Sequence, residues 1–358
     1  MERISNISQL IFVIGFPRSG TSWLSSLINS HRDTVYRHEF FGRHHRSFGD
    51  ALFRKLRFDD GLSDEDYASA IGILLKGEVD SDKPPFFRKR FGLVTNSTVR
   101  KLVWLMAKAR PLLAPVYTHL CMPRAGNSVA LVIKETRSSV NLHSIIRGVR
   151  TDKLIVLVRH PYGVIASHVR GNKAGVMSES SSGGRRDWLR FHADARYVRD
   201  NRITEDYILK IPEVEFLAIS WRVQNDDYLR IHEAHRCSRV IVYEAFLNET
   251  LHNAIELLEF LGLQADDQVI EFVRDSSRPR RNASVLAKDA SCDYYSVYRG
   301  KDFDADRWRK SLSPEDLALI DRHTRSLVYS LGLDKWIEPR DGRTKVPAGL
   351  AERSQQVS

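Results

Sequence analysis

The sequence predicts an α/β fold with a central parallel sheet and helices on both faces. Four short, almost entirely apolar runs carry this prediction, because strands that helices cover on both faces read this way. Long segments with helical patterning separate the runs, as the crossover connections of parallel strands require. The runs are Leu10–Ile14, Ala130–Ile133, Leu154–Val158 and Val240–Tyr243. We expect a sheet of about four or five strands.

Two helices late in the chain have clear boundary signals. Ser313 offers an N-cap, and Pro314 follows at the first helical position. An apolar stripe from Leu251 to Leu258 ends at Gly262, a C-terminal signal. Both helices are expected to have a packing role.

The chain reads as one domain. Its 358 residues are 42% apolar, enough to bury a core, and neither a repeat nor a long linker divides it. We expect a domain over 1–338, with a helical insertion at 40–129 that shapes an acceptor pocket and a mobile loop at 171–186. Residues 339–358 lack periodicity and are expected to be a disordered tail.

The charge balance favours anionic ligands. The chain carries 40 Arg, 15 Lys and a net charge of +10. Guanidinium groups grip phosphate or sulfate through paired hydrogen bonds. The Arg residues are scattered rather than clustered with aromatic residues, which disfavours a nucleic-acid-binding protein.

The cysteines indicate a reducing compartment. Cys121, Cys237 and Cys292 are odd in number and lack metal-ligand spacing. The apolar run Leu10–Phe16 is too short to span a bilayer. We therefore expect a cytoplasmic protein without a membrane span; peripheral membrane contact and the oligomeric state stay open.

The most informative segment is a predicted strand, a glycine-containing loop and a helix start. Gly15 and Gly20 permit a tight path, and the helix N-terminus offers backbone N–H groups to an anion. This pattern predicts a P-loop-like three-layer fold. The residues expected to hold the anion are Pro17, Arg18, Ser19, Gly20, Thr21 and Ser22.

Two features separate this loop from a nucleotide triphosphatase loop. Gly20 is followed by Thr21 without the Walker lysine, and Leu154–Val158 runs into Arg159 rather than a magnesium-holding Asp. The loop therefore fits a donor handled by Arg and backbone dipoles. An ordinary glycine turn and a P-loop kinase or nucleotidase acting on a phosphorylated small molecule remain the alternatives.

A second anion motif follows the strand at 154–158. Arg159 ends the strand, and Ser167 lies eight residues later, within the next predicted helix. A guanidinium at a strand end and a hydroxyl in the first turns of a helix can converge on one phosphate.

Together the two motifs resemble the sulfotransferase family that uses 3′-phosphoadenosine 5′-phosphosulfate. Gly15–Leu24 is similar to the family's 5′-phosphosulfate loop, and Arg159 with Ser167 to its 3′-phosphate motif. The resemblance is closest to carbohydrate-type and bacterial members. It implies transfer of a sulfuryl group to a hydroxyl, or an amine, of a carbohydrate, glycolipid or other small acceptor, with no metal required.

Later stretches extend the resemblance over most of the chain. Val132–Arg137 and Trp221–Leu263 contain segments similar to the family's core strands and helices. Arg299 and Gly300 resemble the element that closes over the 3′-phosphate. Their order departs from the usual Arg-Lys-Gly, so the roles of Arg299 and Lys301 stay open.

The resemblance also implies the catalytic groups. Glu39 is the first choice for the base that takes the acceptor proton, and His38 is the second. Burial beside Phe40 and Phe41 is expected to raise the pKa of Glu39, whereas a plain ion pair with an Arg is the alternative reading. Arg18 is placed at the leaving oxygen. Lys134, at the end of the adjacent predicted strand, is a candidate second cation, and a structural or solvated lysine is the alternative.

The residues around Glu39 are not expected to bind a metal. His38-Glu39-x-x-Gly42 falls short of the His-Glu-x-x-His zinc helix. His44 and His45 lie between two Arg residues and are expected to form a basic rim.

Overall fold

The computed structural model describes residues 7–58, 62–124, 126–136, 141–277, 297 and 307–336. Five parallel strands form one sheet in the order β2-β3-β1-β4-β5. They are β1 (Ile7–Ile14), β2 (Thr34–His38), β3 (Val129–Glu135), β4 (Lys153–Val158) and β5 (Ser238–Val242). The predicted α/β class is therefore confirmed.

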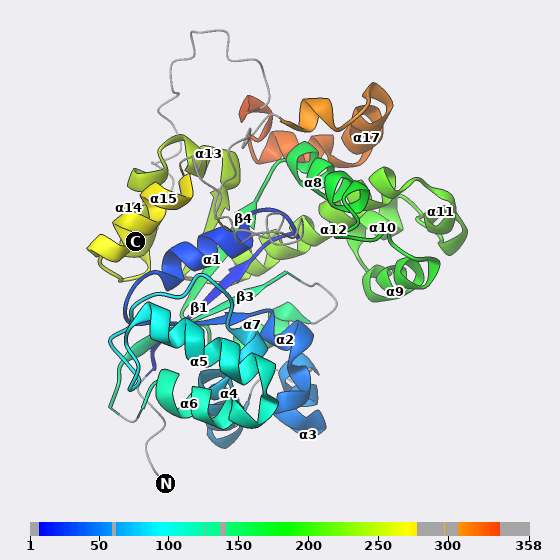
Figure 1. The fold of residues 1–358 in the computed structure, drawn as a ribbon. Coiled ribbons are helices and arrows are strands. Elements are labelled where there is room, and N and C mark those ends of the chain that lie inside the picture. The colour runs from blue at the N-terminus through cyan, green and yellow to red at the C-terminus, as the bar shows by residue number, and fades with distance from the viewer. Residues whose placement is uncertain are drawn as a thin grey trace, which may run out of the picture.

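Helices cover both faces of the sheet (Figure 1). One face packs on α1 (Thr21–Asn29), α13 (Tyr243–Asn248), α14 (Thr250–Phe260) and α15 (Asp267–Ser277). The other packs on α3 (Gly49–Phe58), α4 (Asp64–Lys76), α7 (Leu142–Gly148), α8 (Pro161–Lys173), α12 (Glu213–Ala234) and α17 (Pro314–Ser330). The central strands are buried on both faces, which explains their unbroken apolar sequences.

The predicted strand ends needed two corrections. The four predicted runs did not include β2, because Arg37 and His38 follow Val35 and Tyr36 and interrupt the apolar run. Tyr243 was predicted to end a strand but opens α13, where its ring lies against the loop between β1 and α1. Both predicted late helices are confirmed: Ser313 caps α17, and α14 ends before Gly262.

The insertion at 40–129 folds into helices between β2 and β3. Beside α3 and α4 it contains α2 (Phe40–Arg43), η1 (His45–Phe48), η2 (Val79–Ser81), α5 (Ser97–Ala109), η3 (Pro111–Leu113) and α6 (Ala114–Cys121). That it shapes an acceptor pocket stays a prediction.

The loop predicted at 171–186 is shorter in the structure. Residues 171–173 belong to α8, and α9 (Ser182–His192) begins four residues before the predicted end. Ser181 explains the early start, because its side chain accepts a hydrogen bond from the Gly184 N–H and caps α9. The remaining elements are α10 (Arg196–Asp200), α11 (Glu205–Lys210), η4 (Arg307–Lys310) and η5 (Asp334–Trp336).

Candidate active site

The loop between β1 and α1 lies against the ends of β4 and β5. A Cβ on Gly15 would come within 2.5 Å of the Leu157 carbonyl oxygen, and one on Gly20 within 2.6 Å of the Tyr243 ring. Gly20 also has φ +98°, in the region that favours glycine. It precedes α1 without a side-chain cap, so the first-turn N–H groups of α1 face the loop. Pro17, Ser19, Thr21 and Ser22 lie in this loop and in the first turn of α1. That they hold an anion stays a prediction.

Arg159 leaves the end of β4 and crosses to this loop. Its Nη1 donates to the Arg18 carbonyl oxygen at 3.1 Å, and its guanidinium carbon lies 4.7 Å from the centre of the Tyr243 ring. The Trp221 indole N–H donates to the Arg159 carbonyl oxygen at 3.1 Å. Gly163 leaves room beneath the guanidinium, because a Cβ there would lie 2.9 Å from Arg159 Nε.

Ser167 lies in the second turn of α8 and contacts the loop directly. Arg18 Nε donates to Ser167 Oγ at 3.2 Å. The two anion motifs, separated by about 140 residues in sequence, thus meet at one edge of the sheet. They meet because β1 and β4 are parallel neighbours whose carboxyl ends share that edge.

Several polar atoms here have no hydrogen-bond partner among the described residues. Ser19 Oγ and His168 Nε2 are buried in this state. Arg159 Nε also makes no hydrogen bond, although Glu244 Oε1 lies 3.8 Å from it. An unsatisfied buried polar group costs about 1–3 kcal/mol, so such groups indicate a bound water or ligand. The residues present therefore fit an anionic ligand at the loop.

Glu39 lies at the end of β2 and is held by three cationic or hydroxyl donors. Its carboxylate accepts hydrogen bonds from Lys134 Nζ at 2.6 Å, Thr136 Oγ1 at 2.8 Å and Arg43 Nε at 2.6 Å. Its own N–H donates to the Lys134 carbonyl oxygen at 2.7 Å. The parallel pairing of β2 with β3 sets these contacts, because it places His38 opposite Lys134.

The expectation of a raised pKa for Glu39 is wrong. Burial alone would raise it, but the charge of Lys134, with hydrogen bonds from Lys134 and Arg43, holds the pKa of Glu39 well below its usual range. Phe40 and Phe41 do pack into the core beside it. The carboxylate is consequently ionised. Its contact with Arg43 matches the alternative prediction, an ion pair between Glu39 and an arginine.

The surroundings of His38 make its imidazole a weak base. Its Nδ1 is 3.0 Å from the Tyr36 hydroxyl oxygen, and its Nε2 is 3.8 Å from Glu39 Oε1. Burial, followed by the charge of Lys134, lowers the pKa of His38 to about 3. The imidazole is therefore neutral at pH 7.

Sequence reasoning gave no role to Glu135, although the residue follows Lys134 directly. Alternation along β3 sends its carboxyl to the opposite face of the sheet, where it accepts hydrogen bonds from the N–H groups of Gly42 and Thr136. Burial, and then the charge of Glu39, raises the pKa of Glu135 to about 7. The sequence did offer a signal for this residue, because Glu135 follows Lys134 at the end of a predicted buried strand.

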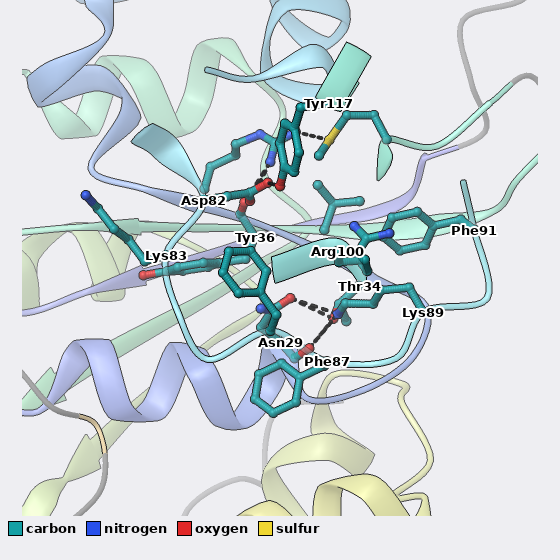
Figure 2. A pocket seen from close by; sticks show the side chains of 14 residues that line it. Asn29, Thr34, Tyr36, Asp82, Lys83, Phe87, Lys89, Phe91, Arg100 and Tyr117 are labelled. Carbon is teal, nitrogen blue, oxygen red and sulfur yellow. Dashed lines mark hydrogen bonds and ion pairs between the residues drawn. The ribbon is translucent and has the colours of Figure 1, made fainter. Parts of the chain in front are cut away.

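A small cavity lies between β2, the end of α1 and the insertion (Figure 2), and both polar and aromatic side chains line it. It encloses about 20 Å³, space for one water molecule. Lys89 beside it donates to Asn29, His31 and Thr34, and Figure 2 shows its ammonium between Asn29 and Thr34. Volume and polarity make this cavity a structural feature rather than an acceptor site.

The remaining predicted site residues cannot be placed. Arg299, Gly300 and Lys301 lie outside the described residues. Among the residues that are described, no three His, Cys, Asp or Glu side chains gather as metal ligands. In the same part of the chain, no helix is long and apolar enough to cross a bilayer.

Comparisons with known proteins give one match to a family. A sequence model described as "Sulfotransferase family" matches residues 10–267. That range contains β2 to β5, β1 from Leu10 onward and the candidate site residues from Pro17 to Ser167. No curated protein matches the chain in sequence.

Solved structures of sulfotransferases show a weak likeness. A sulfotransferase domain from the curacin biosynthetic pathway has 16% identity and a TM-score of 0.42, covering 91% of this chain and 98% of its own. Mouse sulfotransferase SULT7A1, complexed with PAP, has 12% identity and a TM-score of 0.43, covering 93% and 89%. Sulfotransferase STF9 from Mycobacterium avium has 13% identity and a TM-score of 0.39, covering 92% and 77%.

Proposed function

The chain belongs to the sulfotransferase family, and we propose that it moves a sulfuryl group from 3′-phosphoadenosine 5′-phosphosulfate to a hydroxyl or amine of a carbohydrate, glycolipid or other small acceptor. The observation that carries the choice of donor is the contact between Arg18 and Ser167. A single ligand with phosphate groups at two positions can bind both anion motifs only if the two motifs are close to each other in the fold. The kinase alternative lacks support, because the loop has no Walker lysine.

Each anion motif takes one end of the donor in this proposal. Arg18 and the first-turn N–H groups of α1 hold the 5′-phosphosulfate and bear the charge that develops on the leaving oxygen. Arg159 and Ser167 hold the 3′-phosphate. Ser19, in the loop between β1 and α1, can donate from its hydroxyl to the bound donor, and its Oγ has no hydrogen-bond partner among the described residues. Arg299 and Gly300 are proposed to close over this end.

Glu39 is proposed to take the acceptor proton. Its pKa is low because Lys134 and Arg43 contact the carboxylate. An anionic sulfuryl group competes for the Lys134 ammonium, and a Glu39 that loses this contact keeps its burial, which raises its pKa. Lys134 therefore couples arrival of the donor to the basicity of Glu39. His38 is the second choice, with a neutral imidazole beside the carboxylate.

The test is incubation of the chain with labelled donor and a panel of sugars, glycolipids and phenols. The expected result is a sulfate-sized mass gain on one class of acceptor, in the presence of a magnesium chelator. Binding of the product nucleotide, 3′-phosphoadenosine 5′-phosphate, should weaken when Arg159 is changed to Ala. Unchanged binding in that variant would remove the proposed nucleotide site.

A further inference from the structure

A surface of exposed apolar side chains follows the outer side of α5 and continues over η3 and α6. Leu112 is 92% exposed and Leu102 is 55% exposed. We call this surface the α5–α6 face; it consists of Val99, Leu102, Leu105, Met106, Leu112 and Val116. Figure 1 shows α5 and α6 one above the other.

The opposite side of α5 is already used for packing. Trp104 and Ala107 are buried there against Tyr117 and Cys121 of α6. An amphipathic helix normally turns polar residues to solvent once its apolar side is buried. This helix instead presents a second apolar stripe, whose side chains Val99, Leu102, Leu105 and Met106 are between 43% and 59% exposed. Contiguous exposed apolar patches of this kind mark interaction sites.

The segment that carries the face is basic. The sequence from Lys83 to Lys134 contains ten Lys and Arg residues and no Asp or Glu, so its formal charge equals the +10 of the whole chain. Three of the ten, Lys89, Arg100 and Lys134, are buried. The other seven lie at least partly at the surface.

Cations border the apolar stripe directly. Lys101 and Lys108 are seven residues apart on α5 and therefore share one side of it. Arg110 follows the end of the helix and is exposed. Lys108 also pairs with Asp80 at 3.0 Å, so its charge is partly offset. Long basic side chains beside an apolar stripe can extend their charged ends while their stems lie along apolar surface.

We propose that the α5–α6 face docks on the surface of an anionic lipid bilayer. Its aliphatic side chains match the boundary between headgroups and acyl chains, and its cations match anionic headgroups. A second copy of the chain would bring the same cations face to face. A nucleic acid or anionic polysaccharide presents a polar, charged surface, which would not bury six exposed aliphatic side chains. The proposal does not depend on the proposed donor or acceptor.

The test is co-sedimentation of the full chain with vesicles of phosphatidylcholine alone or mixed with phosphatidylglycerol, at physiological ionic strength. The chain should bind the mixed vesicles and leave the neutral ones. Changing Leu102→Glu together with Met106→Glu should lower the partition coefficient by about tenfold or more, because apolar area is lost and negative charge gained. Lys101→Glu with Arg110→Glu should have a similar effect.

Phe191→Glu is the matched control, because Phe191 is 55% exposed on α9, outside the face. It should leave binding unchanged, and thermal unfolding should show that all variants are folded. Absence of binding to mixed vesicles would overturn the proposal. So would binding that Leu102→Glu with Met106→Glu does not weaken, since that indicates non-specific adsorption of a basic protein. A dimer that the same double variant dissociates, without vesicle binding, would assign the face to a second copy.

Discussion

Glu39 has an unusual backbone conformation for its residue type. Its φ is +49°, in the left-handed region that side chains other than Gly, Asn and Asp rarely adopt. The hydrogen bond from its N–H to the Lys134 carbonyl oxygen and the contacts of its carboxylate hold it there. Such strain concentrates at functional sites, because the surroundings must maintain it.

Replacing Glu39 with Gln should remove turnover while leaving nucleotide binding intact. An amide cannot accept the acceptor's proton, and general base catalysis typically contributes about 10²–10⁴-fold. We therefore expect turnover to fall by at least about a hundredfold, with the affinity for 3′-phosphoadenosine 5′-phosphate unchanged. Calorimetry and a steady-state assay measure the two quantities.

The matched control is Glu205→Gln, which removes a carboxylate from an exposed ion pair with Arg186. This change should affect neither quantity, because exposed pairs contribute little. Near-normal turnover in the Glu39 variant would exclude Glu39 as the base and direct attention to His38.

Glu135 should make the stability of the protein depend on pH. Burial, followed by the charge of Glu39, raises its pKa from 4.5 to about 7, so the folded chain keeps a proton that the unfolded chain releases. Stability contributed by this group is present below about pH 4.5 and is lost as the pH rises to about 7. Glu135→Gln removes the titration. The free energy of unfolding of the Glu135→Gln variant, minus that of the original chain, should therefore increase as the pH rises from 4.5 to about 7, by up to about 3 kcal/mol.

Denaturant unfolding of both proteins at several pH values measures this difference. Taking the difference cancels the titration of groups that the two proteins share. A difference that stays constant from pH 4.5 to 7 would contradict the raised pKa of Glu135.

At the scale of elements, the first turns of α8 fix one of the two anion motifs. His160 caps the helix through its Nδ1, which accepts from the Tyr162 N–H, and Pro161 occupies the first helical position. Arg159 therefore leaves β4 in a defined direction and lies over Gly163. The helix start thus sets the position of the guanidinium as well as that of Ser167.

Gly163→Ala should separate binding from stability. Alanine favours a helix over glycine by up to about 1 kcal/mol, so α8 itself gains stability. The added Cβ would lie 2.9 Å from Arg159 Nε and must displace this side chain. We expect the affinity for 3′-phosphoadenosine 5′-phosphate to fall several-fold, measured by calorimetry, without a loss of thermal stability.

Gly72→Ala in α4 provides the control. It is also a helical glycine, but a Cβ there would meet no atom within 4 Å. This variant should gain similar stability with unchanged nucleotide affinity. Equal affinities in both variants would indicate that the position of Arg159 does not matter for binding.

At the scale of the whole molecule, the strand order gathers the candidate site. The loops and side chains that follow β1, β2, β3 and β4 all leave the same edge of a parallel sheet. Arg18, Glu39, Lys134 and Arg159 come from these four strand ends. A ligand that spans them should therefore stabilise the folded sheet as a unit.

Addition of 3′-phosphoadenosine 5′-phosphate should raise the thermal unfolding temperature. A ligand at about a hundredfold excess over its dissociation constant stabilises the folded state by about 2.7 kcal/mol. A magnesium chelator should leave this effect unchanged, because Arg side chains and backbone dipoles are the proposed partners. Adenosine 5′-phosphate, which lacks the 3′-phosphate, should stabilise less. Equal effects of the two nucleotides would contradict the role proposed for Arg159 and Ser167.

Features with local signals could be predicted from the amino-acid order alone. Apolar runs identified four of the five strands, Ser313 and Pro314 identified the start of α17, and the glycine loop with Arg159 and Ser167 carried the family resemblance. These signals depend only on which residues are neighbours in the sequence. The edge strand β2 and the helical start of α9 were missed because Arg37 and the glycine and serine residues near 182 obscured the pattern.

The chemistry of these groups depends on contacts that form only when the chain is folded. Contact between Arg18 and Ser167 depends on β1 and β4 being neighbours in the sheet. The low pKa of Glu39 depends on Lys134, which is 95 residues away in sequence and reaches it through the pairing of β2 with β3. Burial and charge act through space, so the proton affinity of a side chain depends on neighbours that its local sequence does not specify.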